Sequence, residues 1–209
     1  MILSIFFLII VALTVLFFIA ATGKLHPIIL AYLIWNIIIG VLSYNHFFQN
    51  TSTLPPRILL VIIPAVIFVT LAYKNITATT IKTKWLYAIH ALRLPVEICL
   101  FQLYQNGKVP KLMTFEGWNF DILTGITAII LIFTADKFSK KLIRYWHYLG
   151  LTLLSVIVIL AILSAPSPIQ QLARSQPNTA ILMFPFTLLP GLVVPIVFLS
   201  HLLSSHCAS

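Results

Sequence analysis

Long apolar runs recur along the whole chain, and they restrict its fold more than any other feature. Seven runs have the length of about 17–25 residues that an α-helix needs to cross the hydrocarbon core of a bilayer. They cover residues 2–21, 27–48, 57–73, 85–104, 119–135, 145–164 and 179–203, with short connectors between them. We therefore expect an all-α, polytopic integral membrane bundle of seven transmembrane helices, forming a single transmembrane domain over residues 1–209.

The scarcity of charge supports the same class. Charged residues make up 8% of the 209 positions and hydrophobic residues 60%, whereas soluble domains carry about 25% charged residues. The net charge of +9 does not indicate a nucleic-acid partner, because the basic residues lie at the ends of the apolar runs. In that position they set orientation and meet anionic lipid head groups, so the expected partner is the lipid bilayer.

The first run, 2–21, has two interpretations. It is a cleaved signal peptide or a retained helix. We favour retention, because no basic segment precedes the run and its apolar core has spanning length rather than the roughly 7–15 residues of a signal peptide.

The distribution of Lys and Arg predicts the orientation. With the N-terminus outside, the cytoplasmic loops hold eight basic residues and the outer loops hold four. The first group is Lys24, Lys74, Lys82, Lys84, Lys137, Lys140, Lys141 and Arg144, and the second is Arg57, Lys108, Lys111 and Arg174. Cytoplasmic loops are enriched in Lys and Arg, so we expect the N-terminus outside and the C-terminus in the cytoplasm.

A polar stripe interrupts the fourth run. His90, Arg93 and Glu97 stand at spacings of three and four residues, which places them on one helix face. A charge at such depth costs at least about 2.5–3.5 kcal/mol, so Arg93 needs a buried partner. Glu97 and Asp121 are the two candidates, and the stripe is either a polar site or an ion pair that locks two helices together.

A second polar group lies just before and at the start of the fifth run. Glu116, Asn119 and Asp121 flank Trp118 within the segment MTFEGWNFDILTG. Asn119 or Asp121 is suited to cap the N-terminus of the following helix. Alternatively, Glu116 and Asp121 line an outer vestibule that leads to Glu97. Thr124 and Gly125, one turn deeper, permit close approach of another helix or of a ligand.

These residues also carry a resemblance. The pattern R-x-P-V-E from Arg93 to Glu97, G-x-V-P from Gly107 to Pro110 and M-T-F-E-G-x-N-F-D-I-x-x-G from Met113 to Gly125 resembles that of a group of uncharacterised bacterial multi-spanning membrane proteins. The resemblance implies a multi-pass protein of the bacterial inner (plasma) membrane. It implies no activity.

Four of the six histidines fall at similar predicted depth near the cytoplasmic side, and they open a further alternative. They are His26, His90, His147 and His201. Imidazoles from different helices at one depth are able to ligate a transition metal or a haem iron, with His90, His147 and His201 as the candidate ligands. No pair has the spacing of a metal motif, so solvated or interfacial histidines and no cofactor are the preferred interpretation.

The sequence lacks nucleotide-binding, metalloprotease and hydrolase motifs, which favours a non-enzymatic function. We expect transport or binding of a small solute or protons at a buried site formed by Arg93, Glu97, Asp121, Glu116, Asn119 and His90. The alternatives are a haem- or metal-binding membrane redox protein or enzyme, and a structural or assembly subunit.

Overall fold

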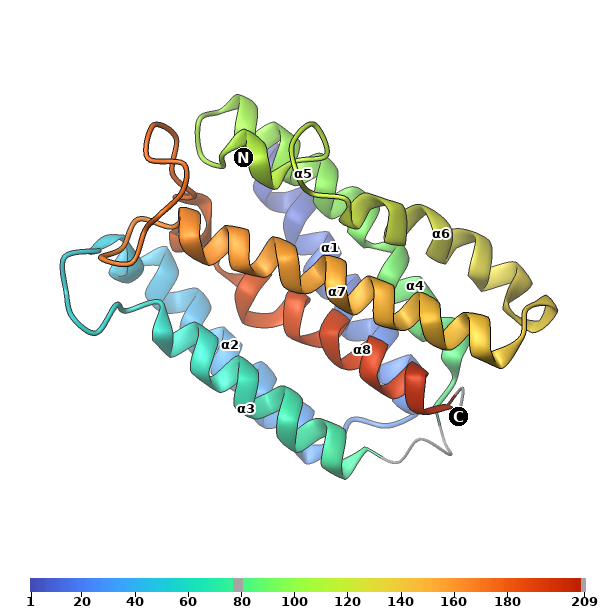
Figure 1. Ribbon diagram of the computed structural model, residues 1–209. Coiled ribbons are helices and arrows are strands. Elements are labelled where there is room, and N and C mark those ends of the chain that lie inside the picture. Colours follow the sequence, from blue (N-terminus) through green and yellow to red (C-terminus); the bar gives the residue numbers. More distant parts are fainter. Residues whose placement is uncertain (77–80, 208–209) are drawn as a thin grey trace.

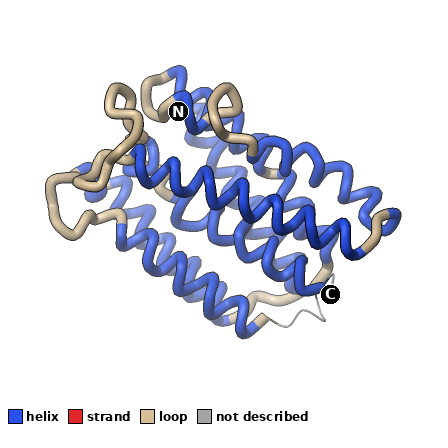
Figure 2. The backbone as a smooth tube through the Cα atoms, in the orientation of Figure 1, coloured by secondary structure: helices blue, strands red, loops and turns tan. Residues whose placement is uncertain are grey.

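The computed structural model describes residues 1–76 and 81–207, and within them the protein is a bundle of helices without a β-strand (Figures 1 and 2). The α-helices are α1 (Ile2–Thr22), α2 (Pro27–Tyr44), α3 (Leu59–Asn75), α4 (Thr83–Ala91), α5 (Arg93–Gln105), α6 (Asp121–Thr134), α7 (Lys140–Ser164) and α8 (Val194–Cys207). Short 3₁₀ turns cover Phe47–Gln49, Lys111–Met113, Ala135–Lys137 and Ala180–Leu182, and a π-helical turn η6 (Leu189–Val193) leads into α8.

Helices α4 and α5 form one rod that is broken only at Leu92, so the described chain consists of seven rods. The cause of the break is Pro95, whose missing N–H cannot bond to the carbonyl of Ala91 four residues earlier. The chain tightens there into a 3₁₀-like turn in which the Leu92 N–H donates to the Ile89 carbonyl at 3.1 Å. The break falls between His90 and Arg93, inside the expected polar stripe.

Four of the rods are long and apolar enough to span a membrane: α1, α2, α4–α5 and α7. The apolar helix α3 and the η6–α8 rod are shorter. The seventh apolar run was expected to be helical over residues 179–203, but its continuous helix begins only near Leu189. Pro185 and Pro190 account for the late start, since neither supplies the N–H that a regular helix needs.

Helix α6 begins deep in the bundle. Asp121, its first residue, forms an ion pair with Arg93, the first residue of α5. The segment 106–120 therefore runs back along α5 from its end toward its beginning. At about 1.5 Å per residue, α6 covers only about 21 Å. The segment before α6 contains only the 3₁₀ turn Lys111–Met113 and irregular backbone, and it packs against α5.

Two aromatic side chains of α2 satisfy carbonyl groups that prolines leave free. Pro64 lies within α3 and cannot bond to the carbonyl of Leu60, which accepts instead from Trp35 Nε1 at 3.3 Å. Pro195 likewise leaves the carbonyl of Gly191 free, and the Tyr32 hydroxyl donates to it. A buried carbonyl group without a donor is costly, so side-chain donors of this kind allow prolines inside buried helices.

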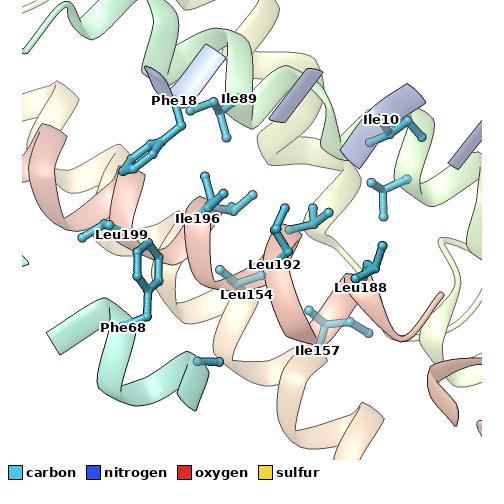
Figure 3. Close-up of a cluster of buried hydrophobic side chains, with 14 of the residues drawn as sticks. Ile10, Phe18, Phe68, Ile89, Leu154, Ile157, Leu188, Leu192, Ile196 and Leu199 are labelled. Atoms are coloured by element: carbon cyan, nitrogen blue, oxygen red, sulfur yellow. The ribbon is translucent and has the colours of Figure 1, made fainter. Parts of the chain in front are cut away.

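Helix α8 runs through the middle of the bundle and contacts α1, α3, α4 and α7. Figure 3 shows the resulting core, in which Ile196 and Leu199 meet Phe18 of α1, Ile89 of α4 and Phe68 of α3. The two termini lie at opposite ends of the bundle (Figure 1). The N-terminal end also carries the loops 45–58, 106–120 and 165–188, and the C-terminal end carries the connectors around residues 23–26 and 135–139.

Candidate functional site

The α5–α6 pair holds a buried polar group, here called the Arg93–Glu97 site, which consists of Arg93, Glu97, Asn119 and Asp121. Arg93 Nη1 donates to Asp121 Oδ1 at 2.7 Å, and the two side chains are only 4% and 7% exposed. Of the two partners expected for Arg93, the structure selects Asp121. Glu97 bonds with Asn119 instead.

Asn119 is the hub of this site. Its Nδ2 donates to both carboxyl oxygens of Glu97, at 2.7 Å each, and lies 3.0 Å from the carbonyl oxygen of Met113. Its Oδ1 accepts from the backbone N–H of Asp121 at 3.1 Å, which caps the start of α6. One amide therefore joins Glu97, the returning loop and the ion pair in a continuous network.

Two glycines set the positions of these groups. A Cβ at Gly117 would lie 2.6 Å from Leu112 Cα, so only glycine allows the returning loop to fold tightly before Asn119. A Cβ at Gly125 would lie 3.0 Å from the backbone nitrogen of Leu94. The close approach expected at Gly125 is thus confirmed, and it brings α6 against the broken rod where Arg93 begins α5.

The charge count of the site is unbalanced. One guanidinium group faces two carboxyl groups, so either one carboxyl group holds a proton or the site carries a net negative charge. Within the described structure Arg93 Nε and Nη2 make no hydrogen bond. A buried group with spare donors and a surplus carboxyl is chemically suited to accept and release a proton.

Glu116 lies outside this network. Its side chain is 44% exposed, and its Oε2 is 3.8 Å from Lys111 Nζ. Both residues line a hollow of about 610 Å³ at the N-terminal end of the bundle, together with Tyr104, Pro110, Leu112, Gly117, Trp118, Ala173, Ser175 and Gln176. The returning loop forms part of this hollow, and the same loop carries Asn119 to Glu97.

His90 belongs to a different group, the histidine cluster, formed with His147 of α7 and His201 of α8. All three side chains are fully buried, so they are not the solvated or interfacial histidines favoured on sequence grounds. One ring nitrogen from each lies within 4.8 Å of the other two. His147 and His201 share a hydrogen bond between their Nδ1 atoms at 3.0 Å, and His90 stacks on His201 with ring centroids 3.8 Å apart.

Several ring nitrogens of the histidine cluster have no partner in the described residues. They are His90 Nδ1 and Nε2, His147 Nε2 and His201 Nε2. A buried polar atom left without a hydrogen bond costs about 1–3 kcal/mol. The histidine cluster therefore brings together several ring nitrogens that are available to bind a metal ion or a proton.

Sequence reasoning missed two residues that shape the cluster. Trp146 packs against all three imidazoles, with ring centroids 4.8–5.5 Å away. Gly150 lies against His201, because a Cβ there would come within 2.6 Å of its Nε2. The available signal was the spacing, since Gly150 follows His147 by three residues and so shares its helix face.

Comparison with known families places the chain in one of them. Residues 55–206 match the family described as Domain of unknown function (DUF8737), and the protein belongs to that family. The match runs from before α3 to the end of α8, so it includes the Arg93–Glu97 site and the histidine cluster. The chain matched none of the curated proteins and none of the solved structures with which it was compared.

Proposed function

We propose that the protein is a seven-span membrane protein that moves protons across the bilayer through the Arg93–Glu97 site. Transport or binding of a small solute at the same site is the broader form of this proposal. The N-terminus lies outside and the C-terminus in the cytoplasm of the bacterial inner membrane.

The outward-facing surface of the long helices supports membrane insertion. In the most apolar 18-residue window of α1 only 28% of residues are buried, and in the windows of α2 and α7 only 33% are. Their remaining Leu, Ile and Phe side chains face away from the bundle. Contiguous apolar surface on this scale is incompatible with water and matches the hydrocarbon core of a bilayer.

The two ends of the bundle differ in charge as the orientation requires. Eight basic residues lie at or near the C-terminal end of the bundle: Lys24, Lys74, Lys82, Lys84, Lys137, Lys140, Lys141 and Arg144. Four lie at the N-terminal end: Arg57, Lys108, Lys111 and Arg174. Cytoplasmic loops are the ones enriched in Lys and Arg.

The single observation that carries the function is the position of Glu97. Glu97 is 2% exposed, and its carboxyl group accepts hydrogen bonds from Asn119, at the inner end of the irregular segment that returns into the bundle. Irregular backbone at membrane depth is tolerated where it is buried in protein or lines an aqueous path. The hollow lined by Lys111 and Glu116 lies at the N-terminal end and is formed in part by the loop that carries Asn119 to Glu97.

Contacts within the site favour protons over a solute. Both Glu97 oxygens lie 2.7 Å from Asn119 Nδ2, and Arg93 lies 2.7 Å from Asp121. The polar side chains thus fill the site with one another, and a proton needs no further space. Intramembrane carboxyl groups arranged with hydrogen-bonding neighbours are typical of proton relays.

A structural role is the second candidate, and the Arg93–Asp121 ion pair favours it. That pair joins α5 to α6 in the interior, where removal of one partner costs about 3–5 kcal/mol. A clamp requires Arg93 and Asp121, and it uses Glu97 only as the hydrogen-bond acceptor of Asn119, a role that does not require an ionisable group. Glu97 therefore separates the two candidates.

The test is proton flux into liposomes that contain the purified protein and an internal pH-sensitive dye, with a potassium diffusion potential as the driving force. We expect wild-type flux above that of protein-free liposomes and loss of that flux in Glu97→Gln. The substituted amide still accepts a hydrogen bond from Asn119 but cannot release a proton.

Glu116→Gln is the matched control, because Glu116 is exposed and outside the network, and it should retain wild-type flux. Wild-type flux in Glu97→Gln, or no flux in the wild type, would contradict the proton proposal. If Asp121→Asn alone lowered the unfolding temperature while the wild type carried no flux, the structural candidate would stand.

A further inference from the structure

We propose that His90, His147 and His201 bind one transition-metal ion between α4, α7 and α8. This site is separate from the Arg93–Glu97 site and goes beyond proton movement. It rests on three fully buried imidazoles with one nitrogen each within 4.8 Å of the others, and on ring nitrogens that have no partner in the described residues.

The donor set defines the class of ion. Neutral imidazole nitrogens suit Zn²⁺, copper, iron and nickel rather than Mg²⁺ or Ca²⁺, which take oxygen ligands. Three histidines from three helices leave a fourth position of a tetrahedral ion open. Each ligand comes from a different rod, so the ion would hold α4, α7 and α8 in register.

The distances are close to those that a metal requires. With metal–nitrogen bonds of about 2.0–2.1 Å, ligand atoms of a tetrahedral ion stand about 3.3–3.4 Å apart. His147 Nδ1 and His201 Nδ1 are 3.0 Å apart in a hydrogen bond that metal binding would replace, and one ring nitrogen of each histidine lies within 4.8 Å of the other two. Side-chain rotations of at most about 1.5 Å bring three nitrogens to ligand distance.

The packing excludes a haem and favours a bare ion. A haem between two axial imidazoles needs its flat macrocycle where the rings of His90 and His201 already stack at 3.8 Å. Trp146 closes another side of the cluster. The missing Cβ of Gly150 makes room for the His201 ring. That room is large enough for a side chain and too small for a porphyrin macrocycle.

The positive charge of Arg93 near the cluster is compatible with a bound cation, because Arg93 already forms an ion pair with Asp121. Arg93 follows His90 by three residues on the α4–α5 rod, so its positive charge lies near the histidine cluster. Its 2.7 Å ion pair with Asp121 offsets that positive charge. The three ligands themselves are neutral, so the ion is held by coordination bonds and not by opposing charge.

The experiment uses the full chain, purified in detergent and stripped with a chelator. Isothermal titration with Zn²⁺ should give one ion per chain. His90→Ala, His147→Ala and His201→Ala should each weaken binding at least tenfold. His46→Ala is the matched control, because the His46 side chain is exposed and bonds only to Gln49 in the described structure, and this variant should bind Zn²⁺ as the wild type does.

Titration of the wild type with Co²⁺ supplies a readout that does not depend on the folding of a variant. Intense visible absorption of four-coordinate Co²⁺ would support the site, and removal of that absorption by one equivalent of Zn²⁺ would support it further. A weak spectrum like that of aqueous Co²⁺ would overturn it. Undiminished Zn²⁺ binding in any of the three histidine variants, or no binding in the wild type, would also overturn it.

Discussion

Single glycines decide where the functional side chains lie. Gly150 is such a residue, because its missing Cβ is the space that His201 fills. The atoms that a Cβ would meet belong to the imidazole ring, at the free end of a side chain, and not to the backbone. A methyl group there displaces the ring while the helices stay in place.

Gly150→Ala should therefore lower both the stability of the protein and its affinity for Zn²⁺. We expect its unfolding free energy to fall by about 1–3 kcal/mol, as in other overpacked interiors. We expect Zn²⁺ affinity to fall about 10–100-fold, the usual effect of disturbing groups that orient metal ligands. Thermal unfolding in detergent and isothermal titration would measure the two quantities.

Gly40→Ala is the matched control. A Cβ at Gly40 would lie 3.7 Å from Phe184 Cε2, an ordinary contact, so stability and Zn²⁺ affinity should both remain near wild type. If Gly150→Ala bound Zn²⁺ as tightly as the wild type, the position of His201 would not govern binding.

Prolines account for much of the irregularity at the scale of helices. Pro95 divides the fourth rod, Pro64 and Pro195 leave carbonyls free, and Pro185 precedes the late start of the last rod. The sequence shows where a backbone N–H is missing, because that is a local property, although the expected helix over residues 179–203 did not anticipate the late start near Leu189. It does not predict which distant side chain compensates, since Trp35 and Tyr32 reach their carbonyls only through the packing of α2 against α3 and η6.

Tyr32→Phe tests this compensation directly. Loss of the hydroxyl leaves the Gly191 carbonyl buried without a donor, so the unfolding free energy should fall by about 1–3 kcal/mol. In a Pro195→Ala background the new backbone N–H at position 195 is able to serve the same carbonyl. The Tyr32→Phe effect should then be smaller by at least about 0.5 kcal/mol, measured by denaturation in mixed detergent. Equal effects in both backgrounds would show that the two groups are not coupled.

At the scale of the whole molecule, the length and position of the apolar runs predict the all-helical class. The sequence was enough to predict that Arg93, Glu97, Asn119 and Asp121 form one buried polar site, because a charge in an apolar run requires a partner. Identifying Asp121 rather than Glu97 as the partner of Arg93 required the path of residues 106–120, and this irregular segment has no hydrophobic periodicity that would predict it. The histidine cluster was harder still, since its three members are far apart in sequence and only the packing of α4, α7 and α8 unites them.

The orientation of the bundle is testable with single cysteines. Ser52 and Ser175 are exposed in loops at the N-terminal end, and Ser139 is exposed between α6 and α7 near the C-terminal end. In a Cys207→Ser background, with Cys99 buried, we expect a membrane-impermeant maleimide to label Ser52→Cys and Ser175→Cys in intact spheroplasts. Ser139→Cys should react only after the membrane is opened, because the eight basic residues near that end hold it in the cytoplasm. The reverse labelling pattern would invert the topology, and with it the side from which protons reach Glu97. Labelling of all three positions in intact cells would contradict a transmembrane bundle altogether.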